Sequence, residues 1–166
     1  MLNNLKNMKN MKNLAILTFT VICIQAPVIA SVAQEDKEAI KQIIAKETIA
    51  FLNVDYKKWS DCWVKVPYAY WSYSDSTTIS RTESWDLMDK TFADYFKNAR
   101  PSSGKVSNEW IEFRIYDGGA YVRFTQKVID EYETTETSQI RILEKKEGQW
   151  KVVCVWAIAR YPDGSQ

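Results

Sequence analysis

The sequence IEFRIYDGGAYVRFTQ at residues 111–126 reads as two alternating strands, and so does IRILEKKEGQWKVVCVWAI at residues 140–158. Asp117-Gly118-Gly119 and Glu147-Gly148 supply the turns. Helical patterns precede both hairpins. Helices first and a meander of strands last is typical of an α+β domain whose curved sheet packs against its own helices. We therefore predict an α+β fold, an arrangement that encloses one pocket.

Residues 1–33 have the pattern of an export signal. An apolar stretch at 14–24 follows three lysines, and Ser31-Val32-Ala33 offers small residues for cleavage. The stretch is short for a membrane span, which needs about 20 apolar residues, so a cleaved signal is favoured and an uncleaved anchor is the alternative. We predict cleavage after Ala33, a single mature domain at residues 34–166, and a periplasmic or secreted location.

The charge of the predicted mature chain is close to neutral. Loss of Lys6, Lys9 and Lys12 leaves 19 basic residues against 21 acidic ones. This balance gives no basic surface for nucleic acid and no polybasic patch for a lipid surface. We therefore expect neither nucleic acid nor, after cleavage, a membrane as partner.

The sequence has no pattern for a cofactor or for nucleophilic catalysis. It contains no histidine, so no serine or cysteine has the usual base beside it, and a metal or haem site is improbable. Cys62 and Cys154 permit a disulfide in an exported protein, but two buried free thiols are the favoured interpretation. Glu, Asp and Tyr remain as acid/base groups, and we expect no cofactor and no metal.

Three helices are predicted before the late strands. Residues 35–53 place Ile40, Ile44 and Phe51 on one face, and residues 56–64 carry an aromatic stripe. Residues 68–74 read as an aromatic strand. Ser80 and Glu83 fit a capping box that would open the third helix, which ends before residue 101. Residues 128–137 look like an exposed turn region.

The first late hairpin has a predicted inner and outer face. With Gly118-Gly119 as the turn pair, three pairs share the face covered by helices: Ile115 with Val122, Phe113 with Phe124, and Ile111 with Gln126. The opposite face carries aromatic residues, which are enriched in protein interfaces. We predict an interface at Trp110, Tyr121 and Arg123.

Glu47 is the strongest candidate for a functional side chain. It lies in the middle of the apolar face of the first helix, where burial costs several kcal/mol unless the carboxylate is paired. It can serve as a ligand contact or general base with a raised pKa. The favoured interpretation is a buried pair with an arginine such as Arg141. Gln126 is the polar residue on the inner face, and it can bind a ligand or satisfy a neighbour.

Aromatic residues are dense, with 7 Trp, 9 Tyr and 6 Phe. They can line a ligand pocket or fill the core, and filling the core is the favoured interpretation. The predicted ligand-binding set combines the aromatic and polar candidates: Glu47, Trp59, Trp63, Tyr70, Trp85, Gln126 and Arg141.

Two motifs resemble the nuclear transport factor 2-like (NTF2-like) superfamily, and within it the small exported SnoaL-like domains. One is E-x7-D-Y-x-x-W-x-x-x-W at residues 47–63, and the other is R-x-L-E-K-x-x-G-x-W-K-V at residues 141–152. The resemblance covers nearly all of the predicted mature chain. It implies a cone of helices on a curved, mostly antiparallel sheet, with a pocket at the wide end and dimerisation through the outer sheet face. The histidine of the dehydratase branch is absent, and the steroid-isomerase positions have no match residue by residue.

Three functions are open from the sequence. The first is binding of a small, partly apolar ligand in the pocket. The second is an acid/base isomerase or hydrolase-like enzyme that uses Glu47, with a tyrosine such as Tyr70 as hydrogen-bond donor. The third is a dimeric association module without a ligand. Binding is favoured over catalysis.

Overall fold

The computed structural model describes residues 32–131 and 133–160. Residues 1–31 lie outside this range, so the predicted leader and its cleavage site stay predictions. The chain divides into two units, Met1–Asp36 and Lys37–Gln166. The fold described below is that of the second unit. Within the described ranges, no helix has both the length and the apolar character needed to cross a bilayer.

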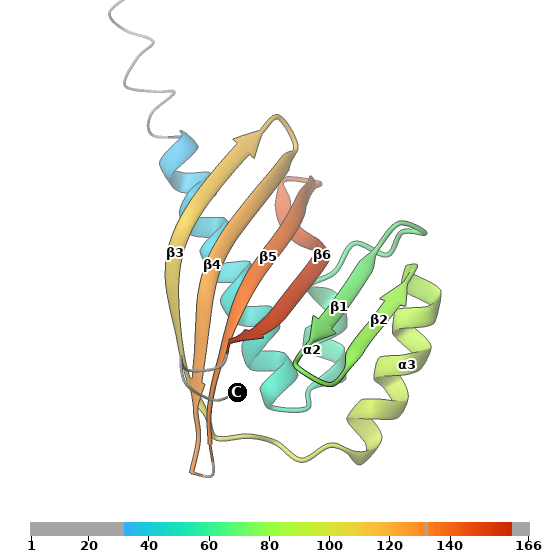
Figure 1. Cartoon of the computed structure of the whole chain (residues 1–166). Coiled ribbons are helices and arrows are strands. Elements are labelled where there is room, and N and C mark those ends of the chain that lie inside the picture. The colour runs from blue at the N-terminus through green and yellow to red at the C-terminus, as the bar shows by residue number, and fades with distance from the viewer. Residues whose placement is uncertain (1–31, 132, 161–166) are drawn as a thin grey trace, which may run out of the picture. The chain divides into compact units, whose positions relative to one another are not determined.

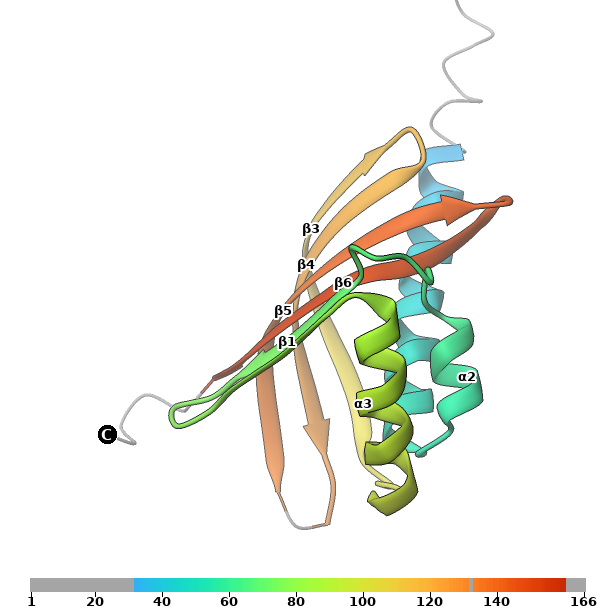
Figure 2. The same cartoon turned by 90° about the vertical axis from the view of Figure 1, so that its right-hand side faces the viewer.

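Three helices cover one face of the sheet (Figure 2). The N-terminal helix runs through residues 37–52 and buries Ile40, Ile44 and Glu47. Helix α2 (Tyr56–Asp61) starts at Asp55, whose carboxylate accepts a hydrogen bond from the backbone N–H of Lys58 at 3.0 Å. Helix α3 (Trp85–Asn98) buries one stripe, Trp85, Met88, Phe92 and Phe96. The apolar stripes of these helices face the sheet, as their spacing predicts.

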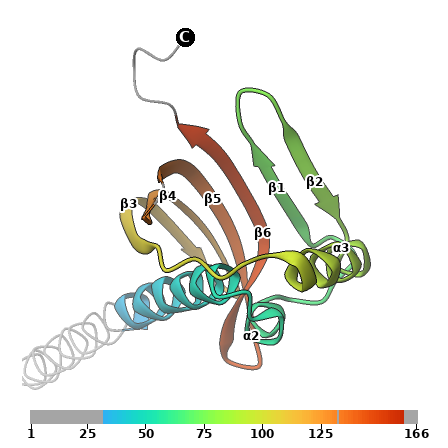
Figure 3. The same cartoon turned by 90° about the horizontal axis from the view of Figure 1, so that it is seen from below.

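The sheet has six strands in the order β2-β1-β6-β5-β4-β3 (Figure 1). Their bounds are β1 (Tyr70–Ser74), β2 (Ile79–Glu83), β3 (Lys105–Tyr116), β4 (Gly119–Ile129), β5 (Thr134–Lys146) and β6 (Gln149–Arg160). Strands β1 and β6 are parallel, and every other neighbouring pair is antiparallel. Seen from below, the strands curve around the side on which the helices lie (Figure 3). The α+β prediction with a curved, mostly antiparallel sheet is confirmed.

The start of the third helix differs from the prediction. Residues 79–83, expected to contain a capping box, form strand β2, and the helix begins at Trp85 with Ser84 as its N-cap. Strand β2 pairs along its whole length with β1, so backbone pairing replaces the local capping motif. Helix α2 also ends earlier than expected, at Asp61. Beyond it, the backbone of Cys62 and Val64 hydrogen-bonds with that of Val152 in β6.

The register of the β3–β4 hairpin differs from the prediction by two residues. Asp117-Gly118 is the turn pair, so Ile115 pairs with Ala120 and Phe113 with Val122. A shift of two leaves each side chain on its expected face. A bulge between Trp110 and Glu112 leaves Ile111 without a partner on β4. From Trp110 toward the start of β3, the inward and outward side chains are therefore exchanged. Trp110 therefore packs against the core, Ile111 is exposed, and the predicted pairing of Ile111 with Gln126 is wrong.

The region expected to be an exposed turn, residues 128–137, is mostly strand. Strand β4 continues to Ile129 and β5 starts at Thr134, so the turn is confined to the residues between them. Thr135 and Thr137 lie on the inner face despite their polarity. The polar composition of this stretch reflects what it faces inside the fold.

Candidate functional site

A cavity of about 320 Å³ lies between the end of the N-terminal helix and the sheet. Its apolar part comes from the end of the N-terminal helix, from β1, and from inward positions of β4 and β6: Phe51, Leu52, Trp71, Tyr73, Val128, Val155 and Ala157. Its polar part is concentrated on β5, where four alternating residues face it: Thr135, Thr137, Gln139 and Arg141. The cavity therefore has one apolar wall and one polar wall.

Glu47 lines the deep part of the cavity and is almost completely buried. The side chain is 4% exposed, and its Oε1 accepts a hydrogen bond from the indole Nε1 of Trp59 at 2.9 Å. Its Oε2 lies 3.6 Å from Nη2 of Arg141. Trp59 belongs to α2 and Arg141 to β5, so the carboxylate connects three separate elements. This is the buried pair with Arg141 that the position of Glu47 predicts.

Arg141 continues a chain of polar contacts along β5. Its Nη1 donates to Oε1 of Gln139, and Gln139 Nε2 donates to Thr137 Oγ1 at 2.6 Å. The guanidinium also lies over the ring of Phe124, 5.7 Å from its centroid. Its Nε is buried and has no hydrogen-bond partner among the described residues. The polar wall is thus a connected network with donor capacity left at its deep end.

Burial raises the pKa of the Glu47 carboxyl above its ordinary value of 4.5, while the charge of Arg141 and the Trp59 hydrogen bond oppose that shift. Burial likewise lowers the pKa of Arg141, against the attraction of Glu47. Because a guanidinium stays protonated at neutral pH, Arg141 keeps its positive charge on the cavity wall, with the Glu47 carboxyl beside it as the partner.

Gln126 lies on the cavity wall beside the N-terminal helix. Its Nε2 donates to Thr48 Oγ1 at 3.2 Å and to Asn108 Oδ1 at 3.1 Å. The inward position expected for Gln126 is correct, and the amide joins the helix to β3 and β4. The Gln126 amide hydrogen-bonds to its neighbours and also lines the cavity. Its position is therefore compatible with both roles expected from the sequence, satisfying a neighbour and contacting a ligand.

The four aromatic residues of the predicted ligand-binding set do not line this cavity. Trp59, Trp63 and Trp85 are buried in the core, where Trp59 lies 5.5 Å from Trp63 and 6.1 Å from Trp85 between ring centroids. Tyr70 pairs with Cys154, and its strand neighbour Trp71 is the one that lines the cavity. The aromatic face of α2 and the residues after it points into the core. Trp59 and Trp63 therefore pack the core and do not contact the cavity.

The aromatic residues that do line the cavity are Phe51, Trp71 and Tyr73. The sequence predicts Phe51 on the core face of the first helix, and Trp71 and Tyr73 alternate along the predicted aromatic strand. Alternation in that strand indicates that Trp71 and Tyr73 share a face, but the sequence does not say which face is inward.

The exposed end of the cavity lies at the β4–β5 turn. Asp130 is half-buried and Glu133 is exposed, and both line the cavity there. Ser102, from the segment between α3 and β3, donates its backbone N–H to Leu52 O at 2.8 Å. Its hydroxyl lies 3.4 Å from Asp130 Oδ2. Through these contacts, Ser102 connects the end of the N-terminal helix with the β4–β5 turn at the mouth of the cavity.

Gly104 lets this segment pass close to β4. A Cβ atom at residue 104 would lie 2.7 Å from Val128 Cγ1, which is closer than real side chains approach. The backbone N–H of Gly104 also donates to Ser102 Oγ at 3.1 Å. Gly104 is therefore a packing requirement of the cavity wall.

The outer face of the sheet carries the other predicted surface. Tyr121 and Arg123 lie there as expected, whereas Trp110 does not, because the bulge turns it inward against Phe113 and Phe124. Glu112 pairs with Arg114 at 2.8 Å and with Arg123 at 3.6 Å. It thereby separates two arginines that would otherwise repel each other. The prediction that Trp110 lies on the outer face is wrong, and the predicted interface at Tyr121 and Arg123 stays a prediction.

The two cysteines that the structure describes are not activated as nucleophiles, because burial raises the pKa of both thiols. Cys62 and Cys154 are free thiols, and burial raises the pKa of Cys62 to about 11, which keeps it protonated at neutral pH. In the part of the chain that the structure describes, no cluster of three or more His, Cys, Asp or Glu side chains could hold a metal ion. The titratable groups at the deep end of the cavity are Glu47 and Arg141.

No family model and no curated protein matches the sequence. Solved structures do. An NTF2-like protein of unknown function from Shewanella oneidensis is 16% identical, with a TM-score of 0.57 over 74% of this chain and 98% of that one. A second NTF2-like protein, from Silicibacter pomeroyi, is 12% identical, with a TM-score of 0.59 over 77% and 98%. A ketosteroid isomerase-like protein from Erwinia carotovora atroseptica is 12% identical, with a TM-score of 0.55 over 75% and 96%.

Identities this low carry information about the fold alone, and the breadth of names among the similar proteins agrees with a fold that hosts several functions. The resemblance of the two sequence motifs and the similarity of the solved structures lead to the same conclusion. The chain has the NTF2-like fold.

Proposed function

We propose that this protein binds a small, partly apolar molecule in the cavity between its N-terminal helix and its sheet. The observation that carries the proposal is a cavity of about 320 Å³ whose deep wall holds an ion pair, Glu47 with Arg141. Ligand pockets commonly have volumes of about 300–1,000 Å³ and combine apolar walls with a few placed polar groups. The alternative function, an association module without a ligand, predicts a filled interior. It does not account for polar side chains that face a cavity.

The apolar wall and the polar wall of the cavity would each contact a different part of the ligand. Its apolar body lies against Phe51, Trp71 and Val155. Its polar edge faces β5, where Gln139 and Thr137 can exchange hydrogen bonds with it. Because the polar part of the lining is concentrated on one strand, the ligand is a molecule with polar groups along one side.

The test is ligand-detected NMR with a fragment library against residues 34–166. Ala157 lines the cavity and is 6% exposed, so Ala157→Phe should fill part of it and remove binding. Ser138 lies on the opposite face of the neighbouring strand and is exposed, so Ser138→Phe is a matched control that should keep binding. If no fragment binds the wild type, or if both variants bind equally, the proposal fails.

Acid/base catalysis by Glu47 is the second candidate function, because burial raises the pKa of a carboxyl that lines a cavity. One of the similar solved structures is called ketosteroid isomerase-like. The contacts favour binding over proton transfer, since Trp59 and Arg141 already engage one carboxylate oxygen each. If a bound fragment were converted to a product, loss of turnover in Glu47→Gln with binding retained would establish the catalytic role.

We also propose that two copies of the chain associate through the outer sheet face. Strands β4, β5 and β6 place adjacent apolar side chains there. Ile142, Trp156 and Ile158 are 43%, 47% and 43% exposed, and Tyr121 and Cys154 adjoin them. Large exposed apolar patches on a soluble domain mark interaction surfaces. The predicted export of the chain likewise stays a proposal, supported by the pattern of residues 1–33.

A further inference from the structure

Arg141, at the deep end of the cavity, has a balanced charge but an unused hydrogen-bond donor. Its Nη2 lies 3.6 Å from Oε2 of Glu47. This distance allows charge compensation but exceeds the length of a charge-assisted hydrogen bond, about 2.7–2.9 Å. Its Nε is buried and has no hydrogen-bond partner among the residues that the structure describes. Since a guanidinium donates hydrogen bonds and accepts none, a ligand that completes this site offers an acceptor to Arg141, an inference that rests on the proposed binding function.

The hydrogen bonds along the polar wall run in one direction, from Arg141 toward Gln126. Arg141 Nη1 donates to Gln139 Oε1, and Gln139 Nε2 donates to Thr137 Oγ1 at 2.6 Å. Thr137 Oγ1 then donates to the backbone carbonyl of Gln126 at 3.5 Å. Because each oxygen of this chain already accepts a hydrogen bond, the buried capacity left on the wall is that of a donor, at Arg141.

Glu47 limits the charge that a ligand can bring to this depth. Glu47 and Arg141 are each 4% exposed, and one carboxylate balances one guanidinium. Trp59 donates to the other carboxylate oxygen at 2.9 Å, so Glu47 is held beside Arg141. A second carboxylate at this depth would be a buried anion without a counter-charge, which is strongly unfavourable. The acceptor that suits Arg141 is therefore uncharged.

The strand register places an apolar path beside Arg141. Arg141 on β5 pairs with Val155 on β6, and Val155 pairs with Trp71 on β1. All three residues line the cavity, so they form one row across the inner face of the sheet. Neighbouring strands are about 4.8 Å apart, so the row spans roughly 10 Å from β5 to β1. This span suits a short apolar body with one carbonyl group at its end.

We propose that the cavity takes an uncharged molecule whose carbonyl oxygen accepts a hydrogen bond from Arg141, and that Glu47 excludes carboxylates from that position. The carbonyl group lies at the β5 end of the row, and the apolar body lies against Val155 and Trp71. Amides and esters belong to this class of ligand, whereas the corresponding acids do not.

Two probes of the same shape test the proposal: 3-phenylpropionamide and 3-phenylpropionate. They share a phenyl ring, a short linker and a carbonyl group, and they differ in an uncharged NH2 group or a charged oxygen. NMR titration at mildly alkaline pH, which favours the ionised Glu47, should show the amide binding at least about tenfold more tightly than the carboxylate. Asp130 and Glu133 line the exposed end of the same cavity, so the wild-type preference alone does not identify Glu47.

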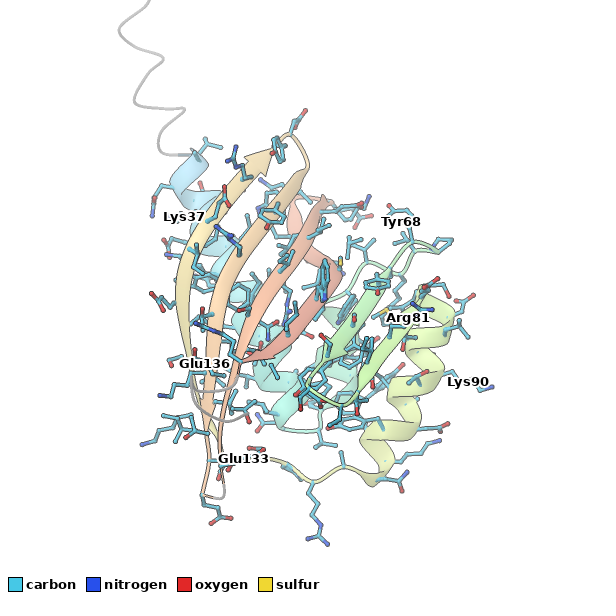
Figure 4. The ribbon with its side chains drawn as sticks, viewed as in Figure 1. Lys37, Tyr68, Arg81, Lys90, Glu133 and Glu136 are labelled. Atoms are coloured by element: carbon cyan, nitrogen blue, oxygen red, sulfur yellow. The ribbon has the colours of Figure 1, made fainter. Side chains whose placement is uncertain are left out.

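One substitution in the pair and one control identify the residue responsible. Glu47→Gln keeps an oxygen for Trp59 and removes the charge that balances Arg141, so the preference should move at least about tenfold toward the carboxylate. Glu136, labelled in Figure 4, alternates with the inward residues of β5 and pairs with Arg160 at 2.8 Å. Glu136→Gln removes the same charge from this outward position and should leave the preference unchanged.

A double variant keeps the inference testable if Glu47→Gln, which leaves Arg141 buried without a counter-charge, does not fold. Glu47→Gln combined with Arg141→Leu removes both charges, which proteins tolerate better than the loss of one. It also removes the donor. The amide should therefore bind about tenfold or more weakly than it binds the wild type, and the carboxylate should gain no affinity.

The outcomes separate this inference from the function on which it rests. The inference is overturned if the carboxylate binds the wild type as tightly as the amide, or if Glu47→Gln shifts the preference no more than Glu136→Gln does. It is also overturned if the amide binds the double variant as tightly as the wild type. Ala157→Phe then decides the proposed function, because loss of probe binding in that variant shows that the cavity is still the site. If neither probe binds the wild type, the inference is again overturned, and the fragment screen decides the function separately.

Discussion

Comparing Trp59→Phe with Trp63→Phe separates the free energy of the hydrogen bond to Glu47 from the free energy of packing. Trp59 and Trp63 are 0% and 1% exposed and belong to the same aromatic cluster. Trp59 Nε1 donates to Glu47, whereas Trp63 Nε1 is buried without a hydrogen-bond partner in the described part of the chain. Replacing either residue with phenylalanine removes the same atoms. Only Trp59→Phe removes a hydrogen bond.

The expected costs follow from these contacts. Loss of the outer indole atoms from a packed core should lower the free energy of unfolding by about 1–2.5 kcal/mol in both variants. Trp59→Phe also loses a hydrogen bond to a charged group, worth about 1.5–3 kcal/mol. Trp63→Phe instead removes an unpaired donor, which offsets part of its packing loss. We therefore expect Trp59→Phe to be less stable than Trp63→Phe by at least about 1.5–3 kcal/mol.

The difference should depend on pH with a definite sign. The folded-state pKa of Glu47 is raised above 4.5, so its contribution to stability is present below that value and falls as pH rises through the folded pKa. The Trp59 hydrogen bond lowers that pKa, so Trp59→Phe raises it further and steepens the loss. The difference between the two variants should therefore be small near pH 4.5, the ordinary value of a glutamate, and grow toward neutral pH.

Urea unfolding followed by far-ultraviolet circular dichroism measures this difference without relying on tryptophan fluorescence. The two variants should have similar slopes, and the comparison uses midpoints at acidic and neutral pH. Equal stabilities at neutral pH would show that the Trp59–Glu47 contact contributes nothing. A difference that does not change with pH would show that Glu47 does not titrate in the way its burial indicates.

Three further changes test the Glu47–Arg141 pair, the close approach of Gly104 to β4, and the outer sheet face. Glu47→Ala should lower the free energy of unfolding in urea by about 3–5 kcal/mol, because it leaves Arg141 buried without a counter-charge; an unchanged midpoint would contradict this. Gly104→Ala should cost about 1–3 kcal/mol by the same assay, since its Cβ meets Val128 at 2.7 Å, and a neutral result would mean that the segment shifts freely. Trp156→Lys should convert a dimer to a monomer in analytical ultracentrifugation with little change in melting temperature, and a wild type that is already monomeric would refute the dimer.

Much of the fold was predictable because its signals are periodic. The inward face of β4 follows from simple alternation. The prediction of that face is correct although the predicted register is wrong by two residues, because an even shift keeps every side chain on the same face. The bulge at Ile111 was not predictable, since nothing in the sequence distinguishes one extra residue from regular alternation. That single residue decided whether Trp110 lies in the core or on the outer face.

The start of α3 shows a different limit. Ser80 and Glu83 fit a capping box by type and spacing, yet residues 79–83 pair with β1 over five positions. A local motif and a long-range pairing compete for the same backbone groups, and only the pairing depends on a strand elsewhere in the chain. Ser84, the actual N-cap, was available to the same reasoning one turn later.

The polar residues of the site were more accessible to sequence reasoning than its aromatic ones. A carboxylate within an apolar stripe requires a partner, and that requirement predicts the pairing of Glu47 with an arginine such as Arg141. An aromatic residue fits the core and a cavity wall equally well, so residue type could not separate Trp59 from Trp71. The polar wall carries an ambiguous signal, the alternation Thr135, Thr137, Gln139, Arg141 at a period of two. Polar residues at this spacing normally face solvent, and the apolar residues between them normally face the core. Partners on other elements, such as Glu47 for Arg141, reverse that assignment on β5 and place its polar face toward the cavity.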